Sequence, residues 1–116
     1  MKMLLKQILS LVLVMLLIQV AIAFHPPALA ADAPDGAKIF ETQCAGCHIN
    51  GGNIIRRGKN LKQKALKKYG MDSIEAIANI VTNGKGNMSA YKDRLTNEEI
   101  QAVSAYVLNQ AEAGWH

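Results

Sequence analysis

The segment Cys44-Ala45-Gly46-Cys47-His48 constrains this chain more than any other feature, because it has the C-x-x-C-H form of a covalent c-type haem attachment site. Two thiols three positions apart can each add to one vinyl group of the porphyrin and form a thioether. The imidazole of His48 then falls under the porphyrin and binds the iron from one side. The motif therefore predicts one haem c, covalently bound through Cys44 and Cys47, with His48 as an axial ligand.

Two other kinds of site use similar residues. A C-x-x-C pair is also the redox dithiol of thioredoxin-like proteins, but that motif usually lies near a βαβ pattern, which this sequence lacks. A zinc site would need further ligands, and only His116 remains as a soft candidate after the motif. Haem is the favoured interpretation, with the dithiol and the zinc site as alternatives.

Residues 1–30 are typical of a secretory signal peptide. Two lysines give a positive start, residues 8–24 are almost wholly apolar, and Ala28-Leu29-Ala30 has the form of an A-x-A cleavage site. An uncleaved anchor is the alternative, although the apolar run is short for a full span of about 20 residues. We expect cleavage after Ala30 and no stable membrane insertion afterwards. Export agrees with c-type haem, which is attached on the exported side of the membrane.

Residues 31–116 would then form one small monohaem cytochrome c domain. The leader carries two lysines and no acidic residue, so its removal lowers the formal net charge from +4 to about +2. A chain this short buries a modest core and often needs a staple, which a covalent haem would provide. Nucleic acid is not an expected partner, because the protein is exported and its net charge is small.

Hydrophobic periodicity predicts four helices and no convincing strand in the mature chain. They span about residues 35–47, 60–68, 72–82 and 96–114. Asp35 is a reasonable N-cap for the first helix, and Thr96 begins a capping box with Glu99 for the last. The prediction is a small all-α domain whose loops fill residues 49–59 and 83–95.

The iron would have one further coordination position, and the mature chain offers few soft ligands for it. Cleavage removes His25 and three of the five methionines, which leaves Met71, Met88 and the C-terminal His116. Met88 lies in a glycine-rich loop whose backbone can approach a flat ligand closely. Met71 is interpreted as core filler. We therefore predict His48 and Met88 as axial ligands, the pair usual in electron-carrying cytochromes.

Several further segments extend this pattern well beyond the haem motif. They are Gly36, Phe40, Gly51-Gly52-Asn53, Tyr69-Gly70-Met71, Ser73 to Ile77, Val81 to Gly86, Tyr106-Val107-Leu108 and Gly114-Trp115. With them, the mature chain resembles the cytochrome c6 family over nearly all of its length. The resemblance implies a class I cytochrome c fold, with about four helices around one haem and the first and last helices crossing near Gly36, Phe40 and Tyr106.

The resemblance also implies a function. Cytochrome c6 is a soluble one-electron carrier and not an enzyme, located in the thylakoid lumen, or in the periplasm. It implies transient docking to membrane redox complexes: the cytochrome b6f complex as donor, and photosystem I or a terminal oxidase as acceptor.

Three positions depart from the usual pattern of that family. Proline usually follows the methionine ligand and phenylalanine stands two residues later, whereas this chain has Ser89 and Tyr91. Glutamine usually precedes the valine of the third helix, whereas this chain has Ile80. An aliphatic side chain in place of an amide changes the field near the haem, which tunes redox potential. A low-potential cytochrome c6-like carrier with other partners is therefore the alternative; an open-iron haem sensor or enzyme is the alternative of a different class.

The segment between Ile49 and Met71 is strongly cationic. It holds no acidic residue and seven basic ones, which are Arg56, Arg57, Lys59, Lys62, Lys64, Lys67 and Lys68. A solvated loop and helix face would account for them. The functional alternative is a docking surface for an acidic partner.

Overall fold

A computed structural model gives the structure of residues 1–23 and 33–116. The chain divides into two units, Met1–Asp32 and Ala33–His116. The four predicted haem residues all belong to the second unit, which therefore contains the candidate site.

The first unit contains one described helix, α1 (Lys2–Ala23). Its stretch Lys2–Val20 has a mean hydropathy of 2.2 and is long and apolar enough to cross a membrane. The helix already begins at Lys2, so the apolar run counted from the sequence was too short an estimate of the span. Length does not separate a leader from an anchor here, because signal sequences have the same property. The predicted cleavage site at Ala28-Leu29-Ala30 lies outside the described residues.

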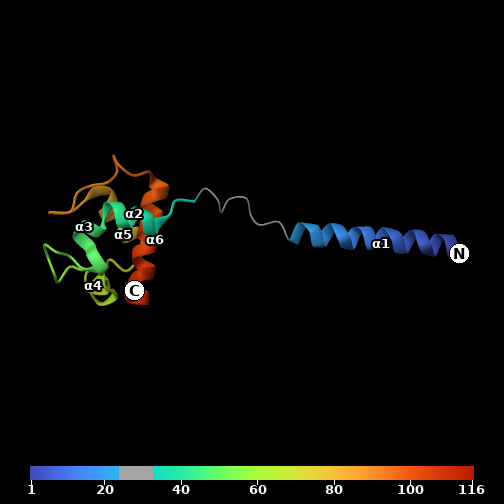
Figure 1. Ribbon diagram of the computed structural model, residues 1–116, viewed down its shortest axis with the longest axis horizontal. Helices are drawn as coiled ribbons and strands as arrows, with labels where there is room; N and C mark the ends of the chain where they lie inside the picture. Colours follow the sequence, from blue (N-terminus) through green and yellow to red (C-terminus); the bar gives the residue numbers. More distant parts are fainter. Residues whose placement is uncertain (24–32) are drawn as a thin grey trace. The chain divides into compact units, whose positions relative to one another are not determined.

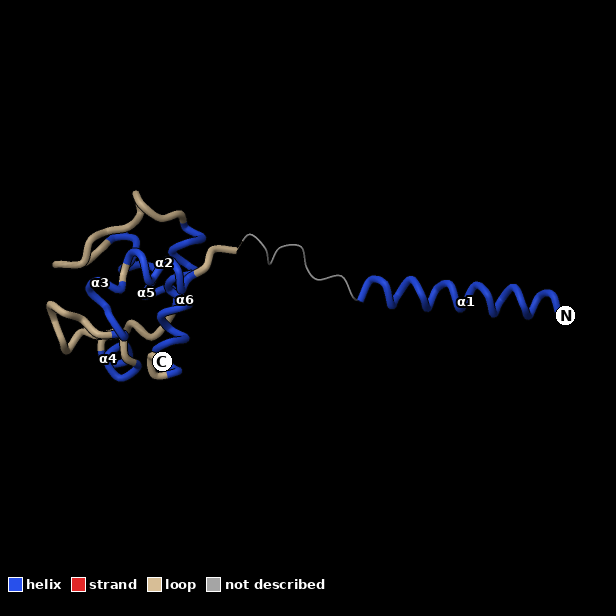
Figure 2. The backbone as a smooth tube through the Cα atoms, in the orientation of Figure 1, coloured by secondary structure: helices blue, strands red, loops and turns tan. Residues whose placement is uncertain are grey.

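The second unit is built from helices joined by irregular loops (Figure 1). In chain order the elements are α2 (Gly36–Gln43), α3 (Ala45–His48), a 3-10 turn η1 (Ile49–Gly51), α4 (Gln63–Lys68), α5 (Ile74–Asn83) and α6 (Asn97–Ala113). Figure 2 shows long loops between η1 and α4 and between α5 and α6. Across residues 1–23 and 33–116 the extended pairing amounts to an isolated bridge between Lys85 and Met88. The all-α prediction is confirmed.

Side-chain caps fix the starts of α2, α5 and α6 close to where the sequence predicts them. The Asp35 side chain accepts hydrogen bonds from the backbone N–H groups of Ala37 and Lys38, and the Ser73 side chain caps α5. Thr96 and Glu99 form both bonds of the capping box at the start of α6.

Two predicted helices are shorter than expected. The first is interrupted at Cys44, whose φ of −120° and ψ of −36° separate α2 from α3. The second begins at Gln63 rather than near Asn60, because the Asn60 side chain forms turn bonds instead. It accepts from the Lys62 N–H at 3.0 Å and donates to the Arg57 carbonyl at 2.9 Å.

The core lies where α6 packs against α2 and α5. A Cβ on Gly36 would collide with the Ala102 carbonyl of α6, so the absence of a side chain allows the two backbones to approach. Next to this contact the Phe40 and Tyr106 rings lie 5.4 Å apart, centre to centre. The predicted crossing is confirmed. The buried apolar cluster comprises Phe40, Leu66, Ile77, Ala78, Val81, Ile100, Val103, Val107 and Ala111.

Trp115 binds the C-terminal end of the unit to the cationic segment between Ile49 and Met71. Its indole Nε1–H donates to the carbonyl of Leu61 at 3.0 Å, across 54 positions of sequence. Its ring lies 5.1 Å from the ring of Phe40. The C-terminus therefore fixes the long loop that follows the haem motif.

Candidate haem site

The two cysteines lie where α2 gives way to α3. Cys44 is the residue between the helices and is half-buried, whereas Cys47 lies within α3 and is exposed. Both thiols are free, so neither is consumed by a disulfide. The Cys47 carbonyl accepts a hydrogen bond from the N–H of Ile54 at 3.1 Å, which ties the following loop to the motif.

The environment of Cys44 does not suit dithiol redox chemistry. Burial raises the pKa of the Cys44 thiol from 9.0 to about 11. A reactive C-x-x-C cysteine instead needs a lowered thiol pKa, because the thiolate is the nucleophile. The structure also gives no support for a zinc site. In the part of the chain that it describes, no group of three or more His, Cys, Asp or Glu side chains could hold a metal ion.

His48 is oriented by a backbone carbonyl. Its Nδ1 lies 2.8 Å from the carbonyl oxygen of Gly52. A carbonyl oxygen can only accept, so Nδ1 is the donor, and in the neutral imidazole with this tautomer Nε2 has its lone pair free for a metal. This is the arrangement in which a histidine binds a metal, with the other ring nitrogen fixed by a hydrogen bond. Sequence reasoning missed the role of Gly52, and Gly51-Gly52-Asn53 was the only signal that could have indicated it.

Met88 lies in a narrow turn that follows α5. The N–H of Lys85 donates to the carbonyl of Met88 at 3.0 Å, and the N–H of Met88 donates to the carbonyl of Lys85 at 3.1 Å. Gly86 has a φ of 59° inside this turn, a value that glycine adopts without strain. The Met88 side chain is half-buried and packs against the core cluster. A thioether held on such a turn is a suitable iron ligand.

The other soft ligands of the second unit lie elsewhere. Met71 follows α4, packs half-buried against the core cluster, and donates its N–H to the carbonyl of Leu66 at 2.8 Å. It has the environment predicted for core filler. His116 is exposed at the end of the chain.

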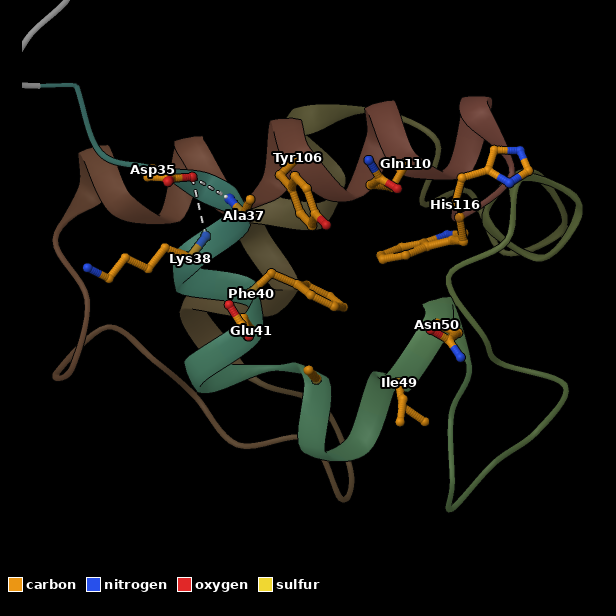
Figure 3. A pocket seen from close by; sticks show the side chains of 12 residues that line it. Asp35, Ala37, Lys38, Phe40, Glu41, Ile49, Asn50, Tyr106, Gln110 and His116 are labelled. Carbon is orange, nitrogen blue, oxygen red and sulfur yellow. Dashed lines mark hydrogen bonds between the residues drawn. The ribbon is translucent and has the colours of Figure 1, made fainter.

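A surface cavity of about 570 Å³ lies between α2 and the C-terminal end of α6. Figure 3 shows Phe40 and Tyr106 entering it from these two helices, with Asp35 and Lys38 near one end. None of the four predicted haem residues lines this cavity, although Ala45 of the haem motif and Ile49, which follows His48, lie in its wall.

The donor set matches a His/Met haem c. Two unbonded thiols are separated by two residues, an imidazole has Nδ1 engaged and Nε2 available, and a thioether stands on a tight turn. Thiols form the covalent bonds to the porphyrin, and nitrogen and thioether sulfur are the iron ligands of electron-carrying cytochromes.

Comparisons with known proteins agree with this chemistry. A sequence-family model described as "Cytochrome C oxidase, cbb3-type, subunit III" matches residues 31–107. The chain is 64% identical over 110 residues to "Cytochrome c6-like" of Nostoc sp. (strain PCC 7120 / SAG 25.82 / UTEX 2576), covering 95% of this chain and 98% of that protein. It is 52% identical over 110 residues to "Cytochrome c6" of the same organism, again covering 95% of this chain and 98% of that protein.

A solved structure also shows similarity to cytochrome c6 proteins. The crystal structure of cytochrome c6C from Synechococcus sp. PCC 7002 resembles this one with a TM-score of 0.68 and 69% sequence identity. The match covers 69% of this chain and 98% of that chain. The all-α fold is therefore a class I cytochrome c fold.

These relatives decide between the readings of the C-x-x-C-H motif. Cys44 and Cys47 stand in the haem-binding position of the family and hold one covalent haem c, so the dithiol and zinc readings are wrong. The protein is an electron carrier and not an enzyme. With its haem motif, fold and near full-length similarity, the chain belongs to the cytochrome c6 family.

Proposed function

We propose that His48 and Met88 are the two axial ligands of the haem iron. The observation that carries this proposal is the hydrogen bond between His48 Nδ1 and the Gly52 carbonyl, which leaves Nε2 free to coordinate. Haem c supplies an iron that takes up and releases one electron. If both residues bind the iron, His48 and Met88 would leave no position open to small molecules and would keep the coordination the same in both oxidation states. That arrangement favours electron transfer over binding or activation of gases.

Replacement of Met88 tests the ligation. The Met88→Ala holoprotein is expected to lose the near-infrared methionine–iron charge-transfer band and to bind carbon monoxide when reduced. Met71→Ala is the matched control, because it removes the other half-buried methionine of this unit and should leave the band intact. If Met88→Ala keeps the band, Met88 is not the ligand. If the wild-type protein binds carbon monoxide readily, the open-iron alternative is favoured.

We further propose that residues 1–30 are a signal peptide removed after Ala30 and that residues 31–116 are the mature cytochrome domain. The supporting observations are the apolar helix α1 and the match to cytochrome c6C, which covers nearly all of that chain but only 69% of this one. The mass of the holoprotein purified from the exported fraction should equal residues 31–116 plus one haem. A full-length mass in the membrane fraction would instead indicate an anchor.

We also propose that this carrier takes electrons from the cytochrome b6f complex and delivers them to photosystem I or a terminal oxidase, in the thylakoid lumen or the periplasm. Its membership of the cytochrome c6 family supports these partners. Reduced protein should be oxidised by isolated photosystem I after a light flash, with a rate that rises with the concentration of the cytochrome.

The second candidate is a low-potential cytochrome c6-like carrier with other partners. Two observations favour it: the chain is 64% identical to the Nostoc "Cytochrome c6-like" against 52% to the "Cytochrome c6" of that organism, and Ile80 stands where glutamine is usual. A potentiometric titration of the holoprotein distinguishes the two. A potential equal to that of the Nostoc cytochrome c6, measured alongside, supports the photosystem I donor. A clearly lower potential with the methionine band intact supports the low-potential carrier.

A further inference from the structure

Tyr91 connects the loop that carries Met88 to two other parts of the fold. Its backbone N–H donates to the carbonyl of Val81 in α5 at 2.9 Å. Its side-chain hydroxyl donates to the carbonyl of Gln43 at 3.0 Å, across 48 positions of sequence. Gln43 is the last residue of α2 and directly precedes Cys44. The hydroxyl therefore joins the Met88 loop to the segment that holds the haem thiols.

The Gln43 carbonyl is available because α2 stops there. The last carbonyls of a helix have no partner within the helix. The departure from helical geometry at Cys44 ends the helical hydrogen bonding. A hydroxyl from outside can satisfy such a carbonyl, whereas the phenylalanine usual at this position in cytochrome c6 has no group to donate. The Gln43 bond is thus a feature that the tyrosine adds.

The ring of Tyr91 is itself held on two sides. It is half-buried and packs against the core cluster. The Arg94 guanidinium lies 4.3 Å from the ring centre, within the range of a cation–π contact. The Tyr91 carbonyl also accepts hydrogen bonds from the N–H groups of Arg94 and Leu95, both at 2.9 Å. The core packing and the Arg94 contact restrict the ring, and the carbonyl bonds hold its backbone, so the hydroxyl is directed toward Gln43.

We propose that Tyr91 is a positioning residue whose hydroxyl clamps the Met88 loop to the Cys44 segment. The proposal rests on the proposed ligation by His48 and Met88. An incoming ligand can replace Met88 only when the loop moves away, and that movement breaks the Tyr91–Gln43 bond. The bond therefore stabilises the methionine-ligated state relative to the open state.

Tyr91→Phe removes the hydroxyl and keeps the ring. Ferric holoprotein is titrated with imidazole, and replacement of the methionine is followed by loss of the methionine–iron charge-transfer band. Imidazole should bind about three- to tenfold more tightly to the variant, the range expected for loss of one hydrogen bond between neutral groups. Tyr69→Phe is the matched control, because Tyr69 is exposed and lies outside the loop. Its imidazole affinity should equal that of the wild type.

The outcomes separate the clamp from the ligation on which it rests. Equal imidazole affinity of Tyr91→Phe and wild type, with the band intact in both, overturns the clamp and leaves the ligation standing. A wild-type protein without the band overturns the ligation by Met88 and the clamp with it. A merely structural role would lower the thermal midpoint of Tyr91→Phe without changing imidazole affinity well below that midpoint, and this result also counts against the proposal.

Discussion

Gly84 is the residue at which α5 ends and the loop carrying Met88 begins. Its φ of 69° lies in the region that favours glycine. A Cβ on Gly84 would lie 2.6 Å from the Met88 carbonyl oxygen and 2.7 Å from the Ala90 nitrogen, both backbone atoms that cannot give way cheaply. At the scale of single residues, the Met88 turn thus depends on the absence of one side chain.

Gly84→Ala should destabilise the holoprotein by about 1–3 kcal/mol and weaken ligation by Met88, because both the backbone angle and the close contact become strained. Thermal unfolding and the intensity of the methionine–iron band measure the two effects. Gly58→Ala is the control, because its Cβ would meet no atom within 4 Å. Equal stability of the two variants would contradict the argument.

Ile80 is half-buried on α5, next to the buried Val81. Ile80→Gln should raise the reduction potential by tens of millivolts if the residue lies near the haem. A difference of about 1 kcal/mol between the two oxidation states corresponds to roughly 40 mV for one electron. Potentiometric titration of wild type and variant measures this shift. An unchanged potential would show that Ile80 does not tune the reduction potential of the haem.

Helix α6 illustrates how a single element is fixed at both ends. The Thr96 hydroxyl accepts from the N–H of Glu99 at 3.2 Å, and the Glu99 carboxylate accepts from the N–H of Thr96 at 2.8 Å. Gly114 ends the helix with a φ of 88°, in the left-handed region. Between these ends, Ile100, Val103 and Val107 are buried against the neighbouring helices. The ends set the length of the element, and the buried face sets its orientation.

Thr96→Ala should lower the free energy of unfolding by about 1 kcal/mol, because one bond of the capping box is lost. For a domain of this size the thermal midpoint should fall by about 4–8 °C. Thr42→Ala serves as the control, because the Thr42 hydroxyl is exposed and bonds to carbonyls within its own helix. A midpoint that falls equally in both variants would speak against the capping argument.

At the scale of the whole molecule, the cationic segment between Ile49 and Met71 presents all seven of its basic residues to solvent. Three side-chain bonds of Asn53 shape the loop. Its amide donates to the Lys59 carbonyl at 2.9 Å, and its oxygen accepts from the N–H groups of Ile55 at 3.0 Å and Arg56 at 2.8 Å. Ile54 and Ile55 are 61% and 56% exposed on the same loop. Docking of an acidic redox partner would require exposed basic and apolar side chains on one surface, and this loop presents both.

If this surface docks acidic partners, the bimolecular rate of electron transfer should fall several-fold with rising salt, as the Debye length shortens from about 30 Å to about 8 Å. Arg57→Glu should lower the rate at low salt more than Lys38→Glu, which makes the same charge change on α2. Stopped-flow or flash kinetics give both rates. A rate independent of salt would refute docking through this surface.

The sequence alone determined the features whose interacting groups lie within a few residues of one another, namely the haem motif and the helix caps. The C-x-x-C-H spacing predicts haem c without knowledge of the fold, because both thiols and the imidazole lie within five consecutive residues. The starts of α2, α5 and α6 were predicted correctly, because each cap bonds to backbone groups two or three residues away.

Only the tertiary structure decided the contacts between distant segments. The orientation of His48 by Gly52 depends on how the chain turns after the motif, and the bond from Tyr91 to Gln43 depends on the packing of the Met88 loop against α2. The break at Cys44 and the late start of α4 also escaped prediction, because helix propensity does not record competing turn bonds or the path that the chain follows around the core. Hydrogen bonds across 48 and 54 positions leave no periodic pattern in a sequence, and the fold alone brings their partners together.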